Sequence, residues 1–243
     1  THAGSTGCVS GCPMPKMPDA LTARFSNLGW KTRGLMISGL GVIIALGHAP
    51  FDLWQFSIIG LAISLILTRH APVVRTALWQ GWALGVGYFG FSLRWIISPF
   101  LVHIERDGWM APFALILMAS GFALFWMLAA GLSQRFFKGS MISFGLLIVG
   151  VEALRSLILT GFPWALLGHV LIGMPMSEMA ALGGPHLLSL IVVSLALCVA
   201  AFATGRVGVA AIGVAAIVLL ALGFGMTRYN TAPRDSDTIV RLI

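Results

Sequence analysis

The sequence predicts an all-α polytopic membrane protein with about seven transmembrane helices. Of its 243 residues 58% are apolar and only 9% charged, and the mean hydropathy is +0.95. Soluble domains average about 25% charged residues. The apolar residues also fall into runs close to the roughly 20 residues that one helix needs to cross a bilayer. These observations exclude an ordinary water-soluble protein. They also argue against nucleic-acid binding, because the cations behind the net charge of +7 lie in short connections between the apolar runs.

The first two runs are short and are separated by residues 48–52, which include Pro50. Proline disfavours helical backbone in the residue before it, so we expect a tight helical hairpin, with one broken helix as the alternative. The remaining five runs are bounded by polar or charged connections. In order, the expected helices are Gly34–His48, Leu53–Thr68, Thr76–Ile97, Met110–Ser133, Met141–Leu159, His186–Thr204 and Val207–Met226.

The ends of the chain differ in character from this helical region of residues 34–226. Residues 1–16 lack the apolar stretch of a signal peptide, and we expect them to be an upstream or non-native segment. Residues 17–33 form a basic, cytoplasmic lead-in. Residues 227–243 are expected to be a periplasmic linker, followed at Thr238–Ile243 by the first strand of a further domain, since that stretch alternates polar and β-branched apolar residues. A frayed polar tail is the alternative.

Charge separates between the two faces that seven spans would define. By the positive-inside rule, the face rich in Lys and Arg is cytoplasmic. The N-terminus is therefore expected in the cytoplasm and the C-terminus in the periplasm. The cations expected on the cytoplasmic face, which carries Asp19 as its acid, are Lys16, Arg24, Lys31, Arg33, Arg69, Arg75, Arg135, Lys138 and Arg206.

Ionisable side chains within apolar runs are costly and need a reason. Glu152 and Arg155 are three residues apart in the fifth run, so they can pair across one helical turn. The alternative is a polar contact to a lipid headgroup or to an associated domain. Arg94, at the outer end of the third run, is expected to extend toward lipid phosphates. Four glycines of the third run, Gly81, Gly85, Gly87 and Gly90, predict close helix packing.

The outer connection of residues 159–169 combines Gly161, Phe162, Pro163 and Trp164. Glycine and proline interrupt the helix, and the two aromatic rings suit interfacial depth, so we expect a loop that dips into the outer leaflet. A plain turn with an aromatic anchor is the alternative. Cys8, Cys12 and Cys198 lack nearby ligands at metal-binding spacing, so no metal site is predicted.

Several of these stretches together resemble the bacterial apolipoprotein N-acyltransferases. The resemblance extends over about residues 17–243. It rests on residues 49–54 (Ala-Pro-Phe-Asp-Leu-Trp), the glycines of residues 81–96 ending near Trp95, and Glu152 with Arg155 leading to residues 159–164 (Leu-Thr-Gly-Phe-Pro-Trp). Gly184, at the start of the sixth span, and the strand-like Thr238–Ile243 follow in the matching order.

The resemblance implies an inner-membrane enzyme with seven helices before a periplasmic nitrilase-like domain. In that family a Glu-Lys-Cys triad takes an acyl chain from phosphatidylethanolamine as a Cys thioester. It then passes the chain to the N-terminal amine of diacylglyceryl-cysteine in apolipoproteins, and no cofactor is implied. None of the triad residues can be assigned up to Ile243, so this stretch alone is expected to be inactive. Two alternatives are a small secondary transporter and a non-catalytic membrane anchor for a synthase domain.

The candidate site that follows has no catalytic residue but has an entrance for the phospholipid and the diacylglyceryl apolipoprotein. Its expected lining residues are Phe162, Pro163, Trp164, Glu152 and Arg155, with Trp95 and Trp54 as additional candidates.

Overall fold

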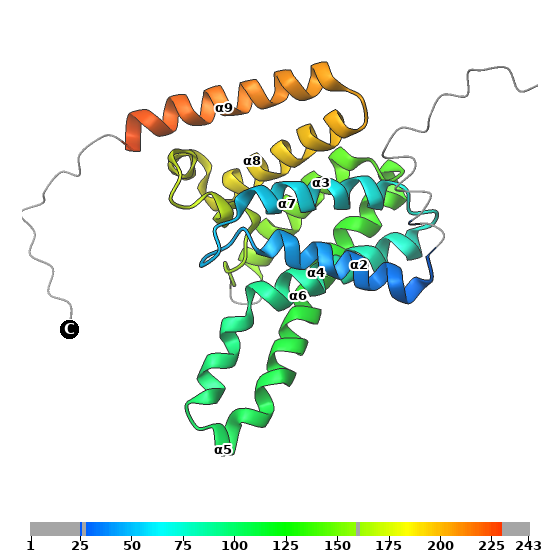
Figure 1. The fold of residues 1–243 in the computed structure, drawn as a ribbon, viewed down its shortest axis with the longest axis vertical. Coiled ribbons are helices and arrows are strands. Elements are labelled where there is room, and N and C mark those ends of the chain that lie inside the picture. Colours follow the sequence, from blue (N-terminus) through cyan, green and yellow to red (C-terminus); the bar gives the residue numbers. More distant parts are fainter. Residues whose placement is uncertain (1–24, 26–27, 159–160, 230–243) are drawn as a thin grey trace, which may run out of the picture.

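The structure is a computed structural model that describes residues 25, 28–158 and 161–229, and all regular secondary structure in these ranges is helical (Figure 1). The expected strand at Thr238–Ile243 and the expected leading segment of residues 1–16 lie outside the described residues.

Each of the seven apolar runs coincides with one of the longer helices. The expected hairpin is confirmed: the first two runs form separate helices, and the backbone N–H of Leu53 donates to the carbonyl of Leu46 across the turn at 3.1 Å. The longer helices are α2 (Trp30–Ala45), α3 (Trp54–Arg69), α4 (Val74–Ser92), α6 (Ala111–Phe137), α7 (Met141–Leu157), α8 (Ala180–Ala203) and α9 (Val207–Tyr229). Short helical pieces between them are η1 (Arg94–Leu101), α5 (Ile104–Asp107), η2 (Gly108–Met110), η3 (Leu167–Leu171) and η4 (Pro175–Met179).

Three helical stretches in the described residues are long and apolar enough to cross a membrane: Ile104–Phe137, Pro175–Ala203 and Val207–Arg228. A fourth is obtained if α4 and η1 count as one span. The expectation of one continuous helix over Thr76–Ile97 is wrong, because the chain bends by 45° between α4 and η1. Beyond the bend the hydrogen bonds tighten, with Ile96 N–H donating to the carbonyl of Leu93, and Pro99 removes a further donor.

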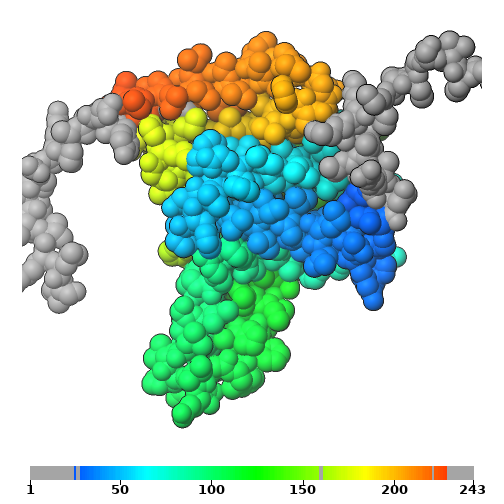
Figure 2. Space-filling model, viewed as in Figure 1, coloured from blue at the N-terminus to red at the C-terminus, as the bar shows by residue number. Residues whose placement is uncertain are grey.

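Helix α4 lies between α2 and α6 and contacts both, so these three helices form one layer. A second group forms around α8, which contacts α3, α7, η3 and α9 (Figure 1). The segment from η1 through α5 to the start of α6 forms an arm that projects from the body of the protein (Figure 2).

Three of the four glycines predicted to pack closely account for the close contacts of α4, whereas a Cβ at Gly90 would meet only the Cβ of Ala119, at an ordinary 3.8 Å. A Cβ atom added at Gly81 or Gly85 would lie less than 3 Å from the backbone of α6, and one at Gly87 would meet the backbone of Ser38 in α2. Bulky aromatic residues fill the space beside them: Tyr88 stacks on Trp126 with ring centroids 4.7 Å apart. This tight packing fixes the position of Tyr88, whose hydroxyl reaches the candidate site.

Candidate functional site

The segment of residues 161–171, called the loop below, belongs to the connection between α7 and α8 and lies partly inside the protein, so its backbone polar groups need partners. Two buried side chains of α7 supply them. Oε1 of Glu152 accepts a hydrogen bond from the backbone N–H of Leu167 at 3.0 Å, and Nη2 of Arg155 donates to the carbonyl of Ala165 at 3.2 Å. Both side chains are only 1% exposed. They attach the loop to α7.

The expected pairing of Glu152 with Arg155 is not found. The ion pairs in the described part of the chain are Arg106–Asp107 and Arg228–Glu178. The two α7 side chains instead reach residues 10 and 15 positions further along the chain. Spacing of three residues permits a pair, but the buried carbonyl and N–H of the loop compete for the same charged groups.

Helix α4 contributes a third contact to the same loop. The Tyr88 hydroxyl donates to the carbonyl of Ala165 at 3.2 Å, so this carbonyl accepts from both Tyr88 and Arg155. Nε2 of His48, in the turn after α2, lies 2.8 Å from the Tyr88 oxygen. His169, within the loop itself, has its pKa lowered by burial and by the nearby charges of Arg155 and His186, which favours a neutral ring near pH 7.

Helix α8 holds the other end of the loop. The backbone N–H of Gly168 donates to Oγ of Ser189 at 2.9 Å. The approach is close: a Cβ at Gly168 would lie 2.6 Å from the Cβ of Leu188, the carbonyl of Pro185 and the backbone N of Ser189. Just before this contact, Gly184 has a positive φ of 66° and interrupts the helical backbone of α8. Three helices, α4, α7 and α8, therefore fix the loop.

Aromatic rings extend from this polar cluster toward the surface. The Arg155 guanidinium lies 5.1 Å from the ring centroid of Phe89 and 5.2 Å from that of Phe122. Phe162 stacks on Phe122 with ring centroids 4.8 Å apart. A second aromatic pair in this region is Trp164 of the loop and Trp95 of η1, whose ring centroids are 5.7 Å apart. The charged cluster thus lies beneath an aromatic surface.

An apolar groove of about 640 Å³ lies next to this surface. It is lined by α6 residues between Leu117 and Leu128 and by Phe162 of the loop. Gly121 in its wall has nothing within 4 Å of an added Cβ, so the groove is open at that point. The lining suits an alkyl chain and has no group that would act as an acid, base or nucleophile.

The structure brings most of the sequence-predicted residues together. Glu152 and Arg155 lie buried under the loop, and Phe162, Pro163, Trp164 and Trp95 lie partly or fully exposed around it. Trp54 is different, because it starts α3, packs against the core, and makes no ring contact with Trp95 or Trp164. Arg94 does not simply extend outward: its guanidinium lies over Phe51 and Phe91, 5.1 and 4.7 Å from the ring centroids.

Sequence reasoning missed Tyr88 and Ser189 as hydrogen-bond partners of the loop, and His48 as the partner of Tyr88. Each lies in a different apolar run or turn, and no local pattern connects them. A tyrosine in the glycine-rich run was the one available signal, since a buried tyrosine hydroxyl usually has a partner. Among the described residues no group of three or more His, Cys, Asp or Glu residues could hold a metal ion.

Fold and site together define a helical membrane protein with a loop fixed beside an apolar groove. The family described as "Apolipoprotein N-acyltransferase N-terminal domain" matches residues 40–198, and the chain belongs to this family. It is 39% identical to an apolipoprotein N-acyltransferase of Caulobacter vibrioides over 90% of this chain and 43% of that relative. A relative with the same name from Ralstonia nicotianae is 34% identical over 84% of this chain and 40% of its own length. Another, from Azotobacter vinelandii, is 32% identical over 66% of this chain and 32% of its own length.

The chain therefore spans less than half the length of the curated relatives it matches. Its family membership favours an acyltransferase over the transporter considered from the sequence.

Proposed function

We propose that this chain is the membrane part of an enzyme that transfers an acyl chain from a phospholipid to the N-terminal amine of diacylglyceryl-cysteine in apolipoproteins. The groove lined by α6 and Phe162 carries this proposal. Its lining is apolar and aromatic, which suits an acyl chain that enters from the bilayer. The family name of the relatives supports acyl transfer as the chemistry.

In this proposal the buried polar cluster positions the loop and does not touch the substrate. Glu152, Arg155 and Tyr88 fix the backbone of residues 165–167. The loop in turn holds Phe162 at the groove and Trp164 against Trp95. Precise placement of a bound chain relative to a reacting group lowers the barrier to transfer, and a small displacement costs rate. The Cys thioester chemistry that the resemblance implies is assigned to no residue of this chain.

The proposal also includes seven crossings of the inner membrane, with the N-terminus on the cytoplasmic side. The start of α2, the end of α3 and the turn between α8 and α9 lie at one side of the molecule (Figure 1). The loop of residues 161–171 and η4 lie at the other. This arrangement agrees with the charge separation in the sequence, which supports a periplasmic position for the loop.

A chimera tests this function. Residues 1–243 replace the aligned part of the Caulobacter vibrioides relative, and N-acylation of an apolipoprotein is followed by mass spectrometry. We expect Trp164→Ala to slow transfer by about twofold to tenfold, corresponding to the ~0.5–1.5 kcal/mol of an aromatic pair, because the contact with Trp95 is lost.

Trp109→Ala is the matched control, since Trp109 is also exposed but lies on the arm against Phe113. Equal rates for the Trp164 variant and the unmodified chimera would contradict the assignment of Trp164. A chimera that inserts into the membrane without any N-acylation would favour a non-catalytic anchor instead.

A further inference from the structure

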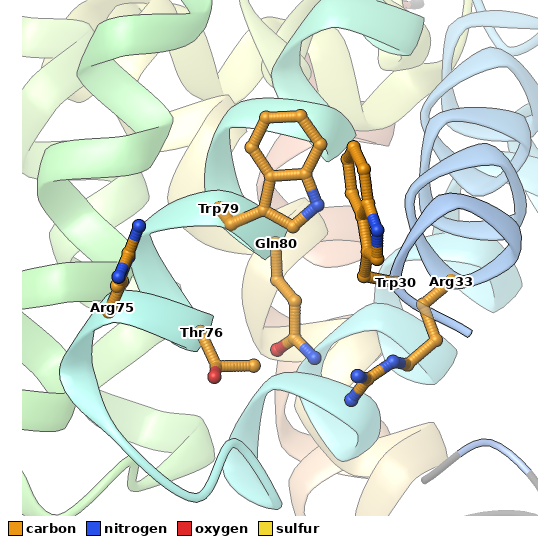
Figure 3. A pocket seen from close by; sticks show the side chains of 6 residues that line it. All are labelled: Trp30, Arg33, Arg75, Thr76, Trp79 and Gln80. Carbon is orange, nitrogen blue, oxygen red and sulfur yellow. The ribbon is translucent and has the colours of Figure 1, made fainter. Parts of the chain in front are cut away.

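A second pocket lies far from the loop, between the first turns of α2 and α4. It has a volume of about 440 Å³ and is lined by Trp30, Arg33, Arg75, Thr76, Trp79 and Gln80 (Figure 3). The Trp30 and Trp79 rings meet edge to face with their centroids 6.1 Å apart, and both are partly exposed. Helix α2 is about 24 Å long at 1.5 Å per residue. The pocket lies at its first turn, whereas His48, which contacts Tyr88 beside the loop, lies just after its last turn.

The cations of this pocket lack an acidic partner in the part of the chain that the structure describes. Neither Arg33 nor Arg75 forms an ion pair within the described ranges. Helix α2 itself carries no acidic residue, and the next acid after it is Asp52, in the turn beyond its opposite end. The first turn of α4 adds to the positive potential, because Val73 provides no side-chain cap for its free N–H groups.

Gln80 gives an independent sign of a ligand. It is 4% exposed, and its Oε1 atom is buried without a hydrogen-bond partner. An unpaired buried amide oxygen costs free energy, so a missing donor is expected next to it. Figure 3 shows the Gln80 amide between the Thr76 hydroxyl and the Arg33 guanidinium, below the two tryptophan rings, with Arg75 at the edge of the pocket.

We propose that this pocket binds the headgroup of an anionic phospholipid with hydroxyl groups, such as phosphatidylglycerol. The phosphate faces Arg33, Arg75 and the start of α4, and a headgroup hydroxyl donates to Oε1 of Gln80. The upper parts of the acyl chains lie against Trp30 and Trp79, as expected for aromatic rings at a membrane interface. An ethanolamine headgroup fits less well because its ammonium would add another cation between two guanidinium groups.

Native mass spectrometry of the full chain in detergent tests this site. The chain is titrated separately with phosphatidylglycerol, phosphatidylethanolamine and inorganic phosphate. We expect one tightly retained phosphatidylglycerol, and binding about tenfold weaker for the Arg33→Gln/Arg75→Gln variant. The matched control, Arg135→Gln/Arg206→Gln, changes the net charge equally at exposed positions outside the pocket and should retain the lipid.

Gln80→Leu gives a second variant that removes the unpaired amide at similar volume and should therefore fold. We expect it to reduce the preference for phosphatidylglycerol over phosphatidylethanolamine. Equal binding of the two lipids by the unmodified chain would overturn the proposal. So would equal losses in the pocket and control variants. If inorganic phosphate displaced phosphatidylglycerol at equal concentration, the site would be a simple anion site and the lipid assignment would be wrong.

Discussion

Replacing Arg155 with methionine is expected to detach residues 165–167 from α7 and to destabilise the protein strongly. The variant loses the hydrogen bond to Ala165 and leaves the Glu152 carboxyl group buried without a nearby cation. A hydrogen bond from a charged group contributes about 1.5–3 kcal/mol. The contacts of the guanidinium with the rings of Phe89 and Phe122 add up to ~2 kcal/mol each when desolvated.

Hydrogen exchange and thermal unfolding in one detergent measure this effect. The amide of Leu167 should exchange much faster in the Arg155 variant, since its bond to Glu152 depends on the same loop position. Arg94→Met is the matched control, because Arg94 also lies over two phenylalanine rings and donates to a backbone carbonyl, but does not touch the loop. Unchanged protection of Leu167 in the Arg155 variant would show that the cluster does not hold the loop.

Gly168→Ala is expected to produce the second large loss of stability. The added methyl would lie 2.6 Å from three atoms of α8, two of them backbone, so the loop or the helix must move. Overpacking of this kind costs about 1–3 kcal/mol, and the hydrogen bond to Ser189 is lost in addition if the loop moves. The transition temperature of purified protein gives the size of the effect.

Gly150→Ala provides a control of opposite sign. Gly150 lies within α7, and an added Cβ would meet nothing within 4 Å. Alanine in a helix interior is favoured over glycine by roughly 0.5–1 kcal/mol, so this variant should be slightly more stable. A Gly168 variant as stable as the Gly150 variant would contradict the tight contact between the loop and α8.

Much of the helical framework could be predicted because it depends on local composition. The apolar runs gave the positions of seven helices, and Pro50 gave the turn between the first two. The bend after Ser92 was missed, since the run over Thr76–Ile97 is apolar on both sides of it. What distinguishes the two sides is a change to tighter hydrogen bonding before Pro99, which hydropathy does not report.

The residues of the candidate site could be singled out from the sequence, but their bonding could not, and their part in binding stays a prediction. Glu152, Arg155, Phe162 and Trp164 could be singled out because charges and aromatic rings in an apolar chain are costly or lie at interfaces, and the structure places all four in or beside the loop. Their partners could not be predicted, since the carbonyl of Ala165 is shared by residues from α4 and α7 that only the fold brings together. Trp54, an additional candidate for the entrance, lies against the core.

Photo-crosslinking most directly tests whether the α6 groove accepts an acyl chain. The chain is placed in nanodiscs with phosphatidylethanolamine that carries a diazirine in one acyl chain, and the adducts are mapped by peptide mass spectrometry. Helix α9 provides the comparison surface, because Val209, Ile212 and Leu219 are apolar and exposed without belonging to the groove. We predict that adducts concentrate on Phe162 and on α6 between Leu117 and Leu128, and that Gly121→Phe, which fills the groove, removes this excess. Adducts spread equally over the groove and α9, unchanged by Gly121→Phe, would contradict the proposed acyl-chain site.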